Sequence, residues 1–208
     1  MTPTGVAIRE VRPQLFDAAE RVLLRAGPQA LTSRAVTTEA GCAKGVLHRH
    51  FADFDTFLAE LVADRIARID ARADALVGTA GSGTVIGNLT GALTDLFGSV
   101  ALRIVGLVIS RDDLRARLRR TTPTGVPLLA EATDTVARYL HAERRMGRLA
   151  ADAEVDLLAP TLVGAAHLLF ADPDRSAPDA AAVARTVGTV LGGALHTPST
   201  GTAHDGRA

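Results

Sequence analysis

The sequence predicts an all-α protein, with an N-terminal domain of three helices followed by a larger C-terminal helical bundle. Apolar residues make up 47% of the 208 residues, and they recur at three- and four-residue spacing in most segments. Runs of β-branched residues that alternate with polar ones are scarce, which disfavours strands. Clear breaks, such as Gly27-Pro28 and GTAGSG at residues 78–83, separate the helical segments.

Three short helices are predicted near the N-terminus. The first covers residues 13–26, where it starts with a proline and ends before a Gly-Pro pair. Thr32 or Ser33 can cap a second helix. Gly41 then supplies the permissive backbone of a tight turn, and a third helix covers residues 44–50. Two helices joined by such a turn form a helix-turn-helix.

The rest of the chain is predicted to form a longer helical bundle. A long helix is expected over residues 55–77, and further helices follow the break after it. Their predicted ranges are 84–98, 100–110, 111–120, 125–146, 154–171 and 178–196. We divide the chain into an N-terminal domain of residues 1–52, a C-terminal domain of residues 53–197, and a polar tail of residues 198–208 that is predicted to be disordered.

Composition restricts the class of protein. The single cysteine, Cys42, excludes an intrachain disulfide framework and fits a reducing compartment. No apolar run approaches the roughly 20 residues that cross a membrane, and no secretory signal is apparent. We therefore expect a cytoplasmic protein without a membrane partner. No spacing typical of a metal site or a cofactor loop stands out, so we expect neither metal nor cofactor.

Charge is unevenly distributed along the chain. The formal net charge is zero, which by itself argues against a nucleic-acid partner. Residues 1–52, however, carry seven basic and four acidic residues, a net charge of +3, and the remainder carries a net charge of −3. The positive excess coincides with the helix-turn-helix. Because it is modest, two copies of this domain should act together on DNA.

The segment LTSRAVTTEAGCAKGVLHRHF, residues 31–51, carries most of the functional information. A short helix with small and basic residues at its N-terminal end is suited to the DNA major groove. KGVLHRHF resembles the KGTLYxHF recognition-helix pattern of the TetR (tetracycline-repressor) family of transcriptional regulators. The resemblance covers residues 13–60 and includes LFDAAERVLLRAG in the first helix and AG at the turn. It implies a DNA-binding domain followed by a ligand-binding and dimerisation bundle.

The resemblance also implies which residues contact double-stranded DNA. Lys44, at the head of the recognition helix, would reach a phosphate or a base edge, and Arg49 is the best candidate for a guanine contact. Gly45 would let the helix backbone approach the duplex closely. The predicted DNA-binding residues are Thr32, Arg34, Lys44, Gly45, Val46, His48, Arg49 and His50.

Several of these positions have plainer alternatives. Thr32 can act as a helix cap alone, and Arg34 can be solvated. His48 stands in place of the family's usual Tyr and can be a packing residue. Ala43 replaces a frequent Ser, which removes a cap and a phosphate donor, and Thr37 replaces a small apolar residue. These departures concern individual contacts rather than the fold.

A homodimer is the second expectation that follows from the resemblance. Dimers of helix-turn-helix proteins place two recognition helices about one turn of DNA apart, roughly 34–36 Å. The last two predicted helices each carry an apolar stripe that fits an interface, and an ordinary intrachain helix pair is the alternative. The stripes consist of Leu158, Leu162, Ala165 and Leu169 on one helix, and of Val183, Val187, Val190, Leu191 and Ala194 on the other.

The middle helices are where the resemblance implies a ligand site. Residues 97–109 are strongly apolar, and an aliphatic-lined pocket with few polar groups predicts a small, largely hydrophobic effector. Arg103 interrupts this run, where a charge needs a partner or a ligand. The candidate pocket residues are Phe97, Arg103, Leu107, Tyr139 and His167, and a structural role is the alternative for the polar ones.

Together these features favour a ligand-responsive DNA-binding transcriptional regulator. The simplest form is a repressor that binds a palindromic operator as a homodimer and is released by its small-molecule effector. A helical ligand-binding or interaction protein with a degenerate DNA-binding domain is the alternative. A small helical enzyme is disfavoured, because no Ser-His-Asp order, HExxH motif or paired-carboxylate pattern stands out.

Overall fold

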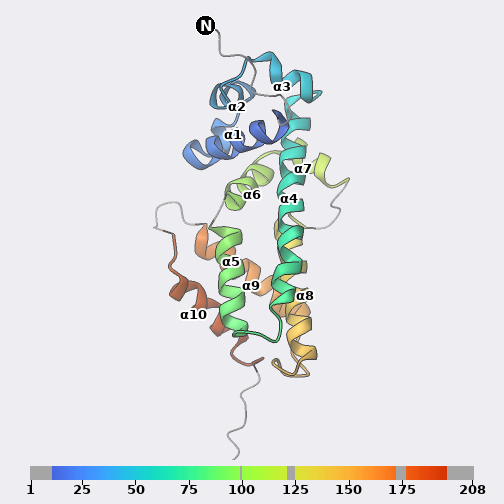
Figure 1. Cartoon of the computed structure of the whole chain (residues 1–208), viewed down its shortest axis with the longest axis vertical. Coiled ribbons are helices and arrows are strands. Elements are labelled where there is room, and N and C mark those ends of the chain that lie inside the picture. The colour runs from blue at the N-terminus through green and yellow to red at the C-terminus, as the bar shows by residue number, and fades with distance from the viewer. Residues whose placement is uncertain (1–10, 99, 121–124, 172–176, 196–208) are drawn as a thin grey trace, which may run out of the picture.

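The structure, a computed structural model, describes residues 11–98, 100–120, 125–171 and 177–195. Regular structure in these residues is helical, without a β-strand. The helices are α1 (Val11–Ala26), the 3-10 turn η1 (Pro28–Ala30), α2 (Ser33–Glu39), α3 (Gly45–His50), α4 (Phe54–Gly78), α5 (Val85–Phe97), α6 (Ala101–Ser110), α7 (Asp112–Leu118), α8 (Leu129–Arg145), α9 (Val155–Phe170) and α10 (Ala180–Leu191). The molecule is elongated, with α1 to α3 at one end and α5, α8 and α10 toward the other (Figure 1).

The predicted all-helical fold is confirmed, and each predicted helix has a counterpart. The largest difference at a helix start concerns α8, which begins at Leu129 instead of residue 125. Leu128 has a positive φ of 71° and therefore stands outside the helix, and its amide donates to the Glu131 carboxylate at 2.6 Å. The predicted tail, residues 198–208, lies outside the described part of the chain.

The N-terminal helices share an aromatic and aliphatic core. Phe16 of α1, Phe51 after α3 and Phe57 of α4 form a cluster with ring centroids 5.0 to 5.8 Å apart. Leu47 of α3 and Val36 of α2 are fully buried in the same core. Such aromatic contacts add to the area that the rings bury. The core fixes the short helix α3, which is too short to be stable alone.

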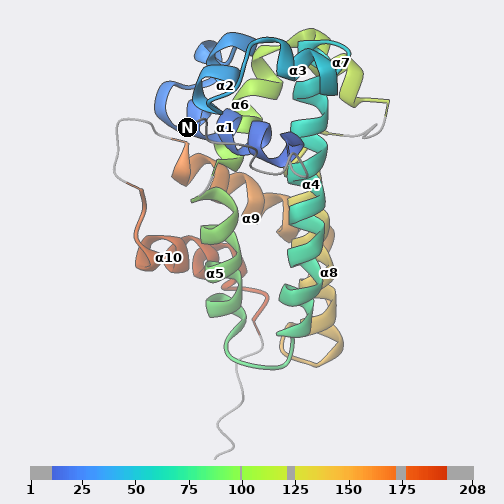
Figure 2. The ribbon, with the colours of Figure 1, turned by 45° about the horizontal axis from the view of Figure 1, so that its top comes forward.

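The helix α4 runs along most of the length of the molecule (Figure 2), and its two ends belong to two different hydrophobic cores. Its first half packs with α1 to α3 and with α6 and α7, and its last turns pack with α5 and α8 to α10. The division that we predicted at residues 52 and 53 therefore does not separate the two cores, because α6 and α7 return to the N-terminal end. A movement of α4 would therefore change the packing at both ends of the molecule.

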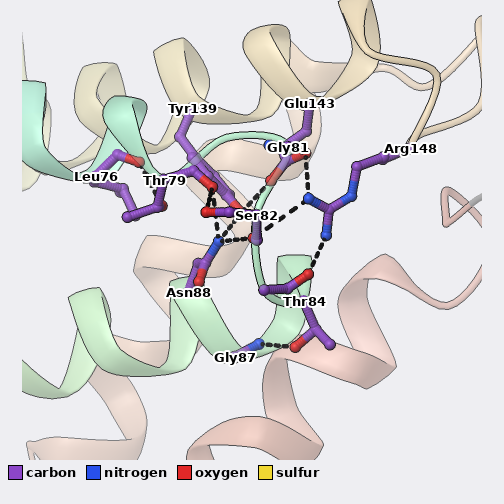
Figure 3. A network of polar contacts seen from close by, with 11 residues as sticks. Leu76, Thr79, Gly81, Ser82, Thr84, Gly87, Asn88, Tyr139, Glu143 and Arg148 are labelled. Atoms are coloured by element: carbon purple, nitrogen blue, oxygen red, sulfur yellow. Dashed lines mark hydrogen bonds and ion pairs between the residues drawn. The ribbon is translucent and has the colours of Figure 1, made fainter.

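A polar network fixes the loop between α4 and α5 against α8 (Figure 3). Glu143 is fully buried, and it accepts hydrogen bonds from the Tyr139 hydroxyl and, at 3.2 Å, from the Gly81 amide. Arg148 lies 3.4 Å from the same carboxylate, and Asn88 donates to the Tyr139 hydroxyl at 3.0 Å. Burial, helped by the bond to Glu143, raises the pKa of Tyr139. The glycine-rich break between the two helices is thus a fixed connection.

Most of the apolar stripe predicted for a dimer interface lies inside one protomer. α10 packs against α5 and α9, so its apolar face covers the protomer's own core. The prediction was therefore wrong for the buried residues, and the intrachain alternative applies to them. The buried residues are Leu162, Val183, Val187, Leu191 and Ala194, whereas Leu158, Ala165, Leu169 and Val190 are half-buried.

Within the described residues, no single helix has both the length and the apolar character needed to cross a membrane; α5 and α6 meet these criteria only as a pair that is bent by 55°.

Candidate nucleic-acid interface and effector cavity

The turn between α2 and α3 is closed by backbone hydrogen bonds. The Cys42 amide donates to the Thr37 carbonyl at 3.0 Å, and Gly41 has a φ of 66°. A left-handed residue of this kind is favourable only for glycine. At the other end of α2, the Thr32 hydroxyl accepts from the Ala35 amide at 3.1 Å, as predicted for a cap. These contacts fix the direction in which α3 leaves α2.

The predicted DNA-contacting residues lie on α2 and α3, at the tip of the molecule (Figure 1). The apolar side of α3 faces inward through Leu47, which is fully buried. The opposite side is therefore available to a duplex. Thr32, Arg34, Lys44, Gly45, His48 and Arg49 are exposed, and Val46 and His50 are half-buried.

Charges on this tip fall into two groups. Arg21 and Arg25 of α1 each lie 2.8 Å from the Glu39 carboxylate, and these hydrogen bonds lower the pKa of Glu39. In contrast, none of the three basic residues that we placed on DNA makes an ion pair within the described residues; they are Arg34, Lys44 and Arg49. Their charges are therefore not neutralised inside the protomer, as contacts to phosphate require.

Two atypical positions of the motif have structural explanations. Thr37 is 2% exposed, and its hydroxyl donates to the Ser33 carbonyl at 3.0 Å, so its polar group is satisfied within α2. Ala43 is exposed, and Lys44, the residue directly before α3, makes no side-chain cap. Cys42 is half-buried in the turn and is a free thiol. The departures from the family pattern thus leave the helix-turn-helix geometry intact.

A position that the sequence analysis missed is Arg12. Its guanidinium donates to the His50 carbonyl at 3.2 Å and pairs with Glu60 of α4. The last residue of α3 is therefore held from α1, a helix 38 residues earlier in the sequence. No motif carries this signal, because Arg12 stands before the apolar pattern of α1 begins.

A family model described as bacterial regulatory proteins of the TetR family matches residues 15–61. This range spans α1, the turn, the recognition helix and the first turns of α4. Over these residues the chain matches the TetR family. No curated protein matches the chain.

Solved structures of bacterial proteins have a similar fold along nearly the whole chain. A transcriptional regulator from Saccharomonospora viridis in complex with choline has a TM-score of 0.68 at 14% identity, covering 90% of this chain and 99% of its own. FadR from Bacillus subtilis in complex with stearoyl-CoA has a TM-score of 0.64 at 17% identity, with 88% and 99% covered. SmeT, the repressor of the Stenotrophomonas maltophilia multidrug efflux pump SmeDEF, has a TM-score of 0.59 at 19% identity, with 91% and 93% covered. At such identities the likeness concerns the fold alone.

The helical bundle contains a cavity of about 500 Å³ between α4, α5 and α8. One wall is apolar, and the α4 wall carries three arginines. This volume falls within the range of small-molecule sites. The cavity is lined by Arg65, Arg68, Ile69, Arg72, Ala75, Leu76, Thr79, Gly87, Asn88, Gly91, Ala92, Leu93, Asp95, Leu96, Ala132, Thr135 and Val136.

The five residues predicted for a pocket are elsewhere. Phe97, Leu107 and Tyr139 are buried packing residues, and His167 lies beside Phe97 with ring centroids 6.0 Å apart. Arg103 is exposed on α6, so solvent rather than a ligand satisfies its charge. None of the five lines the cavity, so the structure does not bring them together around it. The signal that could have found it is the spacing of Arg65, Arg68 and Arg72, which puts all three on one face of α4.

Proposed function

We propose that this TetR-family protein is a transcriptional repressor that binds a palindromic operator as a homodimer and is released by a small, largely hydrophobic effector. The observation that carries the proposal is the tip formed by α2 and α3, where exposed basic residues without ion pairs in the described chain surround a rigid recognition helix. Residues 1–52 act in this proposal as the DNA-binding domain and the following helices as the regulatory one. A cytoplasmic location follows from a role on DNA.

Each contact in the proposal has a physical role. Arg49 reads a guanine edge, and the Val46 methyls contact a thymine methyl. Lys44 reaches a phosphate or a base edge, and the short Gly45 permits the approach of the backbone. Phosphate contacts come from the residues that flank these readers, namely Thr32, Arg34, His48 and His50.

The dimer in this proposal forms through the outer side of α9. Leu157, Thr161, Gly164 and Leu168 follow one another at helical spacing, and all four are exposed. Leu157 is 62% and Leu168 is 75% exposed, unusual values for leucine in the middle of a bundle. A Cβ added to Gly164 would meet nothing within 4 Å, so a second helix has room to approach. The half-buried residues Leu158 and Ala165 would border this stripe.

An interaction protein with a degenerate DNA-binding domain is the alternative. Lys44 and Arg49 are exposed and unneutralised by any described residue, and this observation favours DNA binding over that alternative. TetR-family proteins are regulators, which favours the proposal over a small helical enzyme.

The test is operator selection from random duplexes by the purified protein, followed by binding measurements at several salt concentrations. We expect Arg49→Ala to lose preference at one base pair per half-site, at a cost of about 1–3 kcal/mol. Arg34→Ala should weaken binding to all sequences and reduce the salt slope by about one. Arg185→Ala, an exposed arginine of α10, is the matched control. Failure of the wild-type protein to select any duplex at low salt contradicts the proposal.

A further inference from the structure

Three arginines of α4 occupy the wall of the cavity. Arg65, Arg68 and Arg72 all line it, and Asp95 of α5 is the one acidic residue in the lining. The lining therefore carries a net charge of +2 beside an apolar wall that includes Leu93 and Val136. A guanidinium is suited to a carboxylate or a phosphate, because its planar fork binds two oxygens at once.

Two of these arginines also hold the DNA-binding domain. Arg65 Nη1 lies 3.9 Å from Glu20 Oε1, and Arg68 Nη2 lies 3.8 Å from Asp17 Oδ1. Glu20 and Asp17 belong to α1. Both distances exceed hydrogen-bond length, so these links are ion pairs without a direct hydrogen bond. The cavity wall and the attachment of α1 thus use the same guanidinium groups.

The environments of the two pairs differ. Side-chain exposure is 7% for Arg65 and 15% for Glu20, against 40% for Arg68 and 55% for Asp17. Burial raises the pKa of Glu20 despite the neighbouring Arg65, which indicates that its charge is incompletely compensated. Arg68 also lies 2.9 Å from Asp64 on the same helix. Arg72 is exposed and makes no ion pair with any described residue, so it is available to a ligand.

We propose that the effector is an amphipathic anion, whose carboxylate or phosphate head binds the arginines of α4 and whose apolar body lies against Leu93 and Val136. In binding, the head competes with Glu20 and Asp17 for Arg65 and Arg68. Direct hydrogen bonds from the ligand replace ion pairs at 3.8 to 3.9 Å, and α1 is loosened from α4. Since α1 also holds the end of the recognition helix through Arg12, the loosening reaches the DNA contacts. This inference rests on the proposed function and specifies its effector.

Calorimetry with probes of one chain length tests the ligand chemistry. Decanoate and decyl phosphate should both bind, and the one that binds more tightly identifies the preferred head group. Decanol, which has no charge, should bind at least about tenfold more weakly. Arg72→Gln should lower the affinity for both anions by about tenfold without changing the affinity for decanol. Arg145→Gln removes an exposed arginine of α8 outside the cavity and is the control. Equal binding of decanol and both anions overturns the inference.

A carboxylate variant tests the competition. Glu20→Gln should bind the anion at least about threefold more tightly than the wild type, because the competitor for Arg65 is weakened, and the anion should then release DNA less effectively by a comparable factor. Asp17→Asn should act in the same direction and serves as a second variant if the first is unstable. Asp74→Asn removes a carboxylate of α4 that pairs with Arg138, away from α1, and is the control. Unchanged anion affinity in both α1 variants overturns the competition.

The two proposals can fail separately. A protein that selects an operator but shows no preference for the anions over decanol retains the proposed function and loses this inference. A protein that binds the anions with the expected variant pattern, but selects no DNA, retains the ligand chemistry and loses the proposed function. Circular dichroism and thermal unfolding of each variant separate loss of binding from loss of fold.

Discussion

The guanidinium of Arg12 lies over the ring of Phe51, with 4.4 Å between the guanidinium carbon and the ring centroid. Phe51 follows the last residue of α3 and belongs to the aromatic cluster that joins α1, α3 and α4. Because the same side chain donates to the His50 carbonyl and pairs with Glu60, one residue connects three helices. A cation over an aromatic face is attracted by the ring quadrupole, and the planar guanidinium can stack. The contact holds the C-terminal end of the recognition helix.

Replacement of Arg12 should therefore weaken DNA binding without removal of a proposed DNA contact. We expect Arg12→Gln to lower operator affinity by about tenfold and the free energy of unfolding by about 1 kcal/mol, since a cation–π contact and a hydrogen bond are lost. Arg12→Lys keeps the charge but not the planar guanidinium. Its operator affinity and its stability should lie between those of the wild type and those of Arg12→Gln. Fluorescence anisotropy and urea unfolding measure the effects. Wild-type affinity in Arg12→Gln would show that α3 needs no support from α1.

Local pattern was sufficient to predict the helices but not the contacts between them. The cap of α2 shows this: Thr32 stands directly before an apolar-periodic segment and accepts the expected backbone amide, from Ala35. The turn at Gly41 was likewise predictable, because it depends on one glycine whose φ is positive. Such signals depend only on residues within four positions of one another, so they can be recognised in a single sequence.

Burial on the inner helices was less predictable, because an apolar stripe on a helix does not determine which neighbouring element covers it. Val187 and Leu191 looked like interface residues and are fully buried by the protomer's own α5 and α9. The cavity was missed for a related reason. Its arginines stand on α4 among acidic neighbours, where Arg68 with Asp64 looks like a solvated helix surface. Only the packing of α5 and α8 turns that face inward.

The two glycines of the motif should respond in opposite directions to alanine. Gly41 has a φ of 66°, so Gly41→Ala should cost about 1 kcal/mol of stability, although no atom lies within 4 Å of the added Cβ. Gly45 is helical with open space around it, so Gly45→Ala should stabilise the fold by up to about 1 kcal/mol. If α3 docks on DNA, the same change should lower operator affinity. Thermal unfolding and anisotropy are measured on both variants, and unchanged affinity in Gly45→Ala would contradict close approach of this backbone.

Charge on the outer side of α9 should separate the dimer. We expect Leu168→Glu to yield a folded monomer with weaker operator binding, because a carboxylate cannot be buried there without a partner. Leu24→Glu is the matched control, since Leu24 of α1 is also exposed, at 54%, but far from α9 in sequence and outside the proposed interface. Sedimentation equilibrium gives the mass of each variant. A dimer of Leu168→Glu with wild-type affinity would place the interface elsewhere.

Stability should depend on pH through His167. Its Nδ1 is buried without a hydrogen-bond partner in the described residues, and burial lowers the pKa of this imidazole below its ordinary value of 6.5. The folded protein therefore binds a proton at His167 less readily than the unfolded chain does. The free energy of unfolding is consequently at its full value above about pH 6.5, and it decreases as the pH falls toward the pKa of His167 in the folded protein. His167→Phe keeps a ring beside Phe97 and removes the titration. The drop in unfolding temperature between about pH 7.5 and 5.5 should be smaller in this variant than in the wild type. The same drop in both proteins would mean that other groups, and not this histidine, govern stability in that range.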